Sequence, residues 1–209
     1  MPDFEIEDGF DVPVAGIDEA GRGPWAGPVV AGAVVINDRN IDKALLEGLD
    51  DSKKLSAKKR EQLYDKLFAE EKAGRLFIGI GTASAEEIDR LNILQATFLA
   101  MKRAAEALKI KPQAAIVDGN QNPKGFACPT RTVVRGDAKS YSISAASIVA
   151  KVYRDRLMSE MAKKYPYYGF EKNAGYGTAA HINGLKEHGI CPEHRKSYKP
   201  IKKILGMGE

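Results

Sequence analysis

The chain has 209 residues, of which 44% are hydrophobic and 29% are charged, and its formal net charge at pH 7 is +4. These values are ordinary for a globular protein, and they exclude a disordered chain, a collagen and a coiled coil. A compact domain of this length buries about 70% of the surface of its unfolded chain, so it needs no disulfide or structural metal to fold. We therefore expect one domain over residues 1–209.

The sequence carries no sign of export or of membrane insertion. No apolar run reaches the roughly 18 residues of a membrane-spanning helix, and the first ten residues are acidic where a secretory signal starts with basic ones. The only cysteines, Cys128 and Cys191, indicate a reducing compartment. We expect a cytoplasmic protein without a membrane partner. Its basic balance gives mild support for a polyanionic partner such as nucleic acid.

The predicted elements begin with two strands. Residues 12–18 read as a short apolar strand that ends in two acids, and residues 29–36 read as a buried strand after the turn-rich segment 21–24. Ser56 is a candidate N-cap for a helix over 56–72, which Gly74 ends. A third strand is predicted over 76–82.

The second half of the chain alternates in the same way. Ser84 and Glu87 form a capping box ahead of one longer helix, whose apolar positions continue to Leu108 at helical spacing. Strands are then expected over 114–117 and 132–134, and helices over 142–164 and 178–188. This order predicts a mixed α/β layer in which the first two strands are antiparallel neighbours. Residues from about 165 to 209 are expected to form a small helical appendage.

Acidic side chains follow three of the predicted strands. Asp18 and Glu19 end the first strand, Asp118 ends the strand at 114–117, and Asp137 follows the strand at 132–134. Ligands of α/β sheets gather at the carboxyl ends of strands, so these acids can converge. Converging carboxylates need a cation, and all-oxygen ligands favour Mg²⁺ or Mn²⁺ over Zn²⁺. The alternative is that each acid is only a turn former or an N-cap.

Two further motifs are ambiguous on their own. Gly21-Arg22-Gly23 either forms a tight turn or lets bare backbone approach a sugar-phosphate, because it lacks the third glycine of a dinucleotide fingerprint. Ser144, Ser147, Lys151 and Asp155 share one face of the helix over 142–164. That face is either a solvated stripe with a Lys151–Asp155 ion pair or a surface suited to phosphates. His188, Cys191 and His194 have metal-like spacing, but no second cluster completes a zinc site.

Taken together, the motifs resemble those of the bacterial ribonuclease HII family. The matching segments run in order from about residue 12 to residue 200, and they cover 18–24, 26–30, 51–56, 91–93, 117–120, 136–140, 144–152, 154–155, 175–176 and 194–195. One departure is visible: Asn173-Ala174 stand where the family pattern leads us to expect a His-Lys pair. This difference puts a local phosphate contact in doubt and leaves the expected activity in place.

The resemblance implies a ribonuclease H-like fold, with a five-stranded mixed sheet flanked by helices and a small C-terminal helical appendage. It implies an endonuclease that hydrolyses the RNA strand of RNA–DNA hybrids and cuts 5′ to single ribonucleotides embedded in duplex DNA, leaving 5′-phosphate and 3′-hydroxyl ends. The family's metal ligands map onto Asp18, Glu19, Asp118 and Asp137, which would hold two Mn²⁺ or Mg²⁺ ions. The chain would act as a monomer, and no protein partner can be named.

The resemblance also implies a set of nucleic-acid contacts. The predicted contacts are Gly21, Arg22, Gly23, Lys53, Lys54, Ser140, Ser147, Lys151, Tyr176 and Arg195. Tyr176 and the Gly-Arg-Gly loop are expected to recognise the RNA-to-DNA junction, because the 2′-hydroxyl distinguishes the two sugars. The competing interpretations are a DNA-only nuclease or strand-transferase of the same fold, a non-catalytic nucleic-acid binder, and a nucleotide-binding metabolic enzyme. The last lacks a phosphate-cradling glycine motif.

Overall fold

The computed structural model describes residues 2–52 and 54–207. Its centre is a five-stranded sheet with the strand order β3-β2-β1-β4-β5. The strands are β1 (Val14–Ala20), β2 (Val29–Ile36), β3 (Leu76–Ala83), β4 (Ala114–Asp118) and β5 (Thr130–Val133). β2 lies antiparallel to both β1 and β3, whereas β4 runs parallel to β1 and β5. The mixed α/β fold, with its antiparallel first pair, is confirmed.

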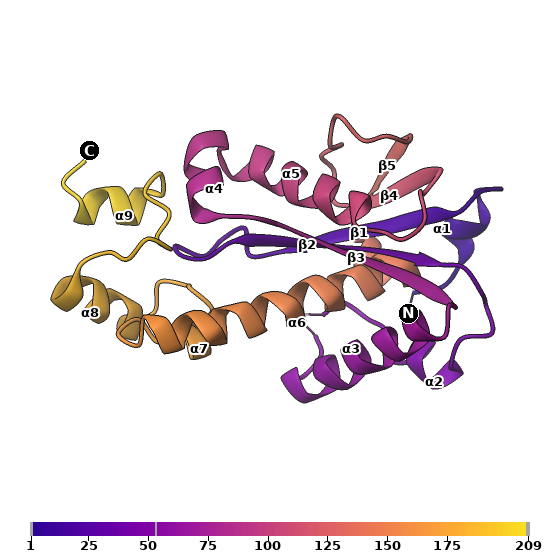
Figure 1. Ribbon diagram of the computed structural model, residues 1–209, viewed down its shortest axis with the longest axis horizontal. Helices are drawn as coiled ribbons and strands as arrows, with labels where there is room; N and C mark the ends of the chain where they lie inside the picture. Colours follow the sequence, from indigo (N-terminus) through magenta and orange to yellow (C-terminus); the bar gives the residue numbers. More distant parts are fainter. Residues whose placement is uncertain (1, 53, 208–209) are drawn as a thin grey trace.

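Helices cover both faces of the sheet (Figure 1). α4 (Ala85–Leu91) and α5 (Ile93–Glu106) lie on one face, and α3 (Ala57–Lys72) and α6 (Tyr141–Lys164) lie on the other. Each face has its own apolar core: one is built on α5, and the other lies between α3, α6 and the sheet. Gly16 of β1 allows α6 to approach closely, since a Cβ there would lie 2.3 Å from the backbone of Ser142. α6 is therefore held directly against the strand that carries Asp18.

The predicted helix starts are present. Ser56 caps α3 by accepting a hydrogen bond from the N–H of Lys59, and Ser84 with Glu87 forms the capping box of α4. The prediction of a single long helix after Ser84 is wrong, because the helix is interrupted at Asn92, where α4 ends and α5 begins. Asn92 has a φ of 68°, and its side chain accepts hydrogen bonds from the first N–H groups of α5.

The structure differs from the sequence-based expectation in a few other places. β5 ends at Val133, and Val134 is 57% exposed rather than part of the strand. Short helical segments were not predicted because one turn carries no measurable period. They are α1 (Glu5–Asp8), α2 (Lys43–Leu46), the 3₁₀ turn η1 (Gly136–Ala138), α7 (Phe170–Asn173) and α9 (Lys199–Ile204).

The chain beyond α6 forms a helical appendage at the far end of that helix (Figure 1). It contains α7, α8 (Ala179–His188) and α9, and it has a separate apolar cluster around Phe170, Leu185 and Ile201. Several hydrogen bonds tie the appendage to the body, among them one from the N–H of Trp25 to the carbonyl of Gly175 and one from the N–H of Arg195 to the carbonyl of Trp25. In the part of the chain that is described, no helix is long and apolar enough to span a bilayer.

Candidate active site

The sheet topology brings the predicted carboxylates to one place. Ile17 of β1 is paired with Val117 of β4 in the parallel ladder, so Asp18 and Asp118 follow side by side at the ends of neighbouring strands. Asp118 also accepts a hydrogen bond of 2.6 Å from the N–H of Gly136, which begins the turn carrying Asp137. Hydrogen bonding thus ties two of the three acid-bearing strand ends together.

The carboxylate of Asp18 is buried and electrostatically strained. Its side chain accepts a 2.7 Å hydrogen bond from the N–H of Glu19, and the residue is only 6% exposed. Burial raises the pKa of Asp18 well above its ordinary value, and the neighbouring carboxylates of Glu19 and Asp118 raise it further. Acids that repel one another in a buried site are suited to share a bound cation.

Asp118 borders two adjacent cavities. One, of ≈ 410 Å³, is lined by Asp118 and Asp137 together with Asp51 and Lys54, and a smaller one of ≈ 90 Å³ is lined by Glu19, Arg22 and Asp118. Among residues 2–52 and 54–207, no three His, Cys, Asp or Glu side chains are gathered closely enough to hold a metal ion as they stand. The donor set fits a hard divalent ion, since it consists of carboxylate oxygens beside open space. Mg²⁺ usually keeps several waters in such a site.

The Gly-Arg-Gly loop directly follows these acids. Gly21 adopts a φ of 96°, and the guanidinium of Arg22 lies 3.3 Å from Glu19 Oε1. Gly23 lies against the ring of Tyr176, because a Cβ added there would be 3.4 Å from Tyr176 Cε1. Tyr176 as a whole is 51% exposed. The structure therefore brings the predicted loop and the predicted tyrosine into contact beside the carboxylates, with the tyrosine half exposed to solvent.

The amino-acid sequence matches a known protein family over most of its length. Residues 15–201 match the family model described as Ribonuclease HII. The chain belongs to the ribonuclease HII family. Relatives in Paramagnetospirillum magneticum and Jannaschia sp. are 53% and 52% identical to it. Each alignment covers 98% of this chain, and it covers 99% and 98% of the respective relative. Both relatives bear the name Ribonuclease HII.

Solved structures agree with the fold. The ribonuclease H2 of Pyrococcus horikoshii OT3 superposes with a TM-score of 0.74 at 32% identity, covering 91% of this chain and 96% of that one. The RNase HII in the PCNA:RNase HII complex from Archaeoglobus fulgidus gives 0.68 at 28% identity, with coverage of 90% and 96%. Bst-RNase HIII in complex with Mn²⁺ gives 0.74 at 16% identity over 94% of this chain and 70% of that one, which shows the fold alone.

Membership of this family settles the broad activity. Ribonuclease HII proteins are hydrolases that act as endoribonucleases on RNA–DNA substrates and depend on divalent metal ions. The predicted family, ribonuclease H-like fold and enzyme class are therefore confirmed. The roles of the individual site residues stay predictions that the geometry supports.

Three of the predicted nucleic-acid contacts, Ser140, Ser147 and Arg195, are buried in this ribonuclease HII chain, and two of them have no exposed surface at all. Ser140 has no exposed surface: its hydroxyl donates to Glu7 and accepts from the N–H of Ile143 as the N-cap of α6. Arg195 is also fully buried, and its guanidinium donates to backbone carbonyls. Neither side chain is placed to touch a substrate directly. The sequence could not reveal this, because Ser and Arg usually lie at the surface.

The polar face of α6 turns out to be mostly paired. Ser147 donates to Ser52 Oγ at 2.8 Å, and Lys151 lies 2.6 Å from Asp155. The ion pair predicted as the simpler alternative is therefore present. Lys54, which is half exposed, lies 3.1 Å from Asp50, whereas Lys53 falls outside the described residues and its contact stays a prediction.

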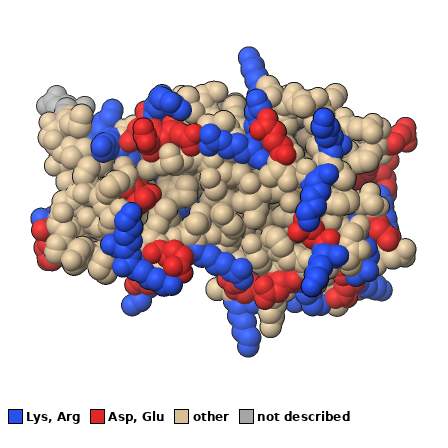
Figure 2. All heavy atoms as spheres, in the orientation of Figure 1, with Lys and Arg blue, Asp and Glu red and all other residues tan. Residues whose placement is uncertain are grey.

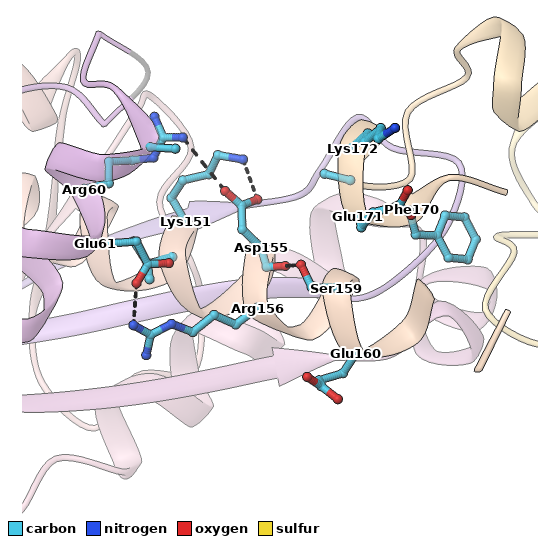
Figure 3. A pocket seen from close by; sticks show the side chains of 13 residues that line it. Arg60, Glu61, Lys151, Asp155, Arg156, Ser159, Glu160, Phe170, Glu171 and Lys172 are labelled. Atoms are coloured by element: carbon cyan, nitrogen blue, oxygen red, sulfur yellow. Dashed lines mark hydrogen bonds and ion pairs between the residues drawn. The ribbon is translucent and has the colours of Figure 1, made fainter. Parts of the chain in front are cut away.

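Another cavity, of ≈ 450 Å³, lies apart from the four carboxylates. Figure 3 shows Lys151 and Asp155 inside it, with Arg60 of α3 on one side and Lys172 of α7 on the other. Acidic and basic side chains are mixed over this view of the molecule, and no large patch of one sign stands out (Figure 2). The net charge of +4 is thus not concentrated on this face.

Sequence reasoning missed one residue that supports the site. Arg154 of α6 is 1% exposed and donates to the carbonyls of Pro28, Ala26 and Ala174. It joins the segment after the Gly-Arg-Gly loop to the turn that precedes Tyr176. Its place inside the Arg154-Asp155 motif was the available signal, but that motif does not say which groups the arginine contacts.

Proposed function

We propose that this chain cuts on the 5′ side of single ribonucleotides embedded in duplex DNA, in addition to the RNA strand of hybrids. The observation that carries the proposal is the contact between Gly23 and Tyr176 at the end of the strand that bears Asp18 and Glu19. An isolated ribonucleotide differs from its neighbours only by the 2′-hydroxyl, so its recognition requires a snug site for one sugar. A bare glycine backbone facing an aromatic ring is such a site.

The catalytic groups we assign are Asp18, Glu19, Asp118 and Asp137, which would hold two divalent ions, Mg²⁺ or Mn²⁺. When bound, such a pair activates a water and stabilises the leaving 3′ oxygen in an in-line displacement, leaving 5′-phosphate and 3′-hydroxyl ends. The chain contributes rigidity: the N–H of Gly136 fixes Asp118, and the N–H of Glu19 fixes Asp18. Carboxylates fixed in this way lose little freedom when a cation arrives.

We further propose that the enzyme works as a monomer in the cytoplasm. The state of its cysteines is compatible with a reducing compartment, since Cys128 and Cys191 are both free thiols. Because the Archaeoglobus fulgidus RNase HII was solved as a complex with PCNA, we propose a PCNA-like protein as a partner to test for this chain.

The direct test is cleavage of a DNA duplex that carries one ribonucleotide, with Mg²⁺ and with Mn²⁺, and with the product ends mapped. Asp118→Asn and Asp18→Asn should fold normally and lose nearly all turnover, because a neutral amide cannot balance the charge of a divalent ion. Asp65→Asn is the matched control, since Asp65 is 73% exposed on α3. Near wild-type turnover of either active-site variant at saturating metal would refute the assignment. Equal cutting of an all-DNA duplex would favour a DNA nuclease.

A further inference from the structure

Arg195 has an unusual environment for a cation. It has no exposed surface, and burial lowers its pKa. Its Nε donates to the carbonyl of Gly27 at 3.0 Å, and Nη1 donates to the carbonyl of Arg22 at 2.8 Å and to the hydroxyl of Tyr198 at 2.9 Å. Nη2 donates to the carbonyl of Gly21. The guanidinium therefore donates its hydrogen bonds to the Gly-Arg-Gly loop and to groups next to it.

These bonds determine where the N–H groups of the loop point. A trans peptide unit is planar, with its C=O and N–H directed to opposite sides. The described chain has no cis peptide bond. Since Arg195 holds the carbonyls of Gly21 and Arg22, the N–H groups of Arg22 and Gly23 point to the other side of the loop. Within residues 2–52 and 54–207, neither N–H donates a hydrogen bond to another group of the chain.

We place the proposed substrate on the side to which these N–H groups point. Arg22 lines the cavity it shares with Glu19 and Asp118, and Gly23 lies against Tyr176. Two adjacent N–H groups directed into the same space make a concave donor pair for an acceptor oxygen. The acceptor that the site offers room for is an oxygen of a sugar-phosphate.

The loop is held from behind by a second group. The hydroxyl of Tyr198 donates to the carbonyl of Arg22, the same carbonyl that receives Arg195 Nη1. The intervening residues are anchored to the body, because Asp89 of α4 accepts hydrogen bonds from the N–H groups of Lys196 and Ser197 at 2.9 and 2.7 Å. Arg195 and Tyr198 are thus carried on a segment fixed at its centre.

We propose that Arg195 and Tyr198 are positioning residues that aim the N–H groups of Arg22 and Gly23 at the ribose 2′-oxygen or the adjoining phosphate. Ribonucleotide selectivity then depends on one buried and one partly buried side chain, and neither touches the substrate. The proposal rests on the proposed function, because it takes the Gly-Arg-Gly loop as the sugar site. It replaces the direct nucleic-acid contact that the sequence motif predicted for Arg195.

Tyr198→Phe is the sharpest test, since it removes one hydroxyl and leaves the ring. Arg195→Lys is the second variant, because a lysine keeps the charge and loses the planar guanidinium that donates to three carbonyls at once. Tyr167→Phe is the matched control, with Tyr167 lying 57% exposed on the appendage. Binding is measured with Ca²⁺ in place of the catalytic ion, on two duplexes that differ by a single ribose or deoxyribose at one position.

Tyr198→Phe should lower the ratio of ribose to deoxyribose affinity by about 3- to 10-fold, the usual consequence of losing one aligned hydrogen bond. Its affinity for the all-DNA duplex should stay at the wild-type value, and its melting temperature should fall only slightly, because the two lost hydrogen bonds are partly or fully exposed. Arg195→Lys should lower the ratio further, and Tyr167→Phe should leave it unchanged. A merely structural role would instead weaken the binding of both duplexes equally, and that result would overturn the proposal.

A measurement on the free protein separates this proposal from the proposed function. The backbone amides of Arg22 and Gly23 should show high NMR order parameters in the wild type and clearly lower ones in Tyr198→Phe. If these amides stay equally rigid in Tyr198→Phe and Arg195→Lys, the positioning role is wrong whatever the substrate. If they loosen while the wild type shows no preference for ribose, the positioning role stands and the proposed sugar recognition is wrong.

Discussion

Acidification should destabilise the folded chain through a buried pair of histidines in the C-terminal appendage. The Nε2 atoms of His181 and His194 lie 2.9 Å apart. The N–H of Cys191 donates to Nδ1 of His194 at 2.9 Å, so that nitrogen is an acceptor and Nε2 of His194 carries the proton. His181 then accepts at Nε2 and donates from Nδ1 to the carbonyl of Tyr176. Both rings are neutral in this chain of hydrogen bonds, and a further proton would break it.

The size of the effect follows from the pKa of His194. The pKa of His194 is lowered from 6.5 to about 4, chiefly by burial and to a smaller extent by the neighbouring ring of His181. The pKa of His181 is lowered in the same direction. Between pH 6.5 and pH 4 the unfolded chain therefore binds a proton that the folded chain excludes, so stability falls as the pH falls. For His194 alone the loss is roughly 2 kcal/mol at pH 5.

The assay is urea denaturation at about pH 7.5, 6 and 5, with the free energy of unfolding compared between variants. His194→Gln should flatten the pH dependence by roughly 2 kcal/mol at pH 5 relative to the wild type. His188→Gln is the control, because His188 lies at the surface and stacks on Tyr167. Asp18 acts with the opposite sign, but it is present in every variant and cancels in the comparison. An unchanged slope in His194→Gln would refute the reasoning.

Two further predictions concern substrate contacts. Tyr176→Phe should keep most cleavage at a single ribonucleotide and Tyr176→Ala should lose it, because only the second change removes the ring that lies against Gly23. Equal cleavage rates in Tyr176→Ala and the wild type would contradict this role of Tyr176. Lys54→Ala should weaken duplex binding and reduce the slope of log affinity against log salt by about one, with the cleavage position unchanged. Lys43→Ala is its control, since Lys43 is an exposed lysine on α2, and equal slopes in both variants would exclude a phosphate contact.

Most of the fold could be predicted from the sequence because its local signals for helices and strands are strong. The capping box at Ser84 and Glu87 and the N-cap at Ser56 locate helix starts within a residue. Asn92 shows the limit of such reasoning. It begins α5 through its side chain, yet the apolar spacing runs through it and predicts one helix. The positive φ of a residue inside a periodic segment is determined by how the two flanking helices pack, and the local spacing of apolar residues carries no information about that packing.

The part of the candidate site that could be predicted consists of acidic residues at the ends of strands. That Asp18, Glu19, Asp118 and Asp137 lie near one another could be expected from position, because acids after adjacent strands meet at one edge of a sheet. Their roles as metal ligands stay predictions that the family resemblance implies. The roles of Ser140 and Arg195 could not be predicted. Ser140 is buried by Glu7, which is distant in the chain, and Arg195 by carbonyls of the loop at 21–27. Contacts of that range depend on tertiary packing, and no local pattern encodes them.

The departure at Asn173 leads to a last prediction. The side chain of Asn173 is buried, and it uses both ends of its amide. Nδ2 donates to the carbonyl of Tyr168 at 2.7 Å and to Thr178 Oγ1 at 3.2 Å, while Oδ1 accepts from the N–H of Gly175 at 2.8 Å. Asn173 thus closes the turn that presents Tyr176. The position is structural in this chain, and it has no free donor to offer a phosphate.

Asn173→Asp preserves size and removes exactly the two donated bonds, because a carboxylate only accepts. Each lost hydrogen bond is worth about 1 kcal/mol, and the new carboxylate adds a buried charge. The free energy of unfolding should therefore fall by roughly 2 kcal/mol or more relative to the wild type. The displaced turn should also reduce cleavage at a single ribonucleotide more than cleavage of a long hybrid, because the hybrid offers many alternative registers. Asn40→Asp is the matched control, since Asn40 is exposed. Wild-type stability in Asn173→Asp would show that the turn is held by Gly175 and the backbone alone.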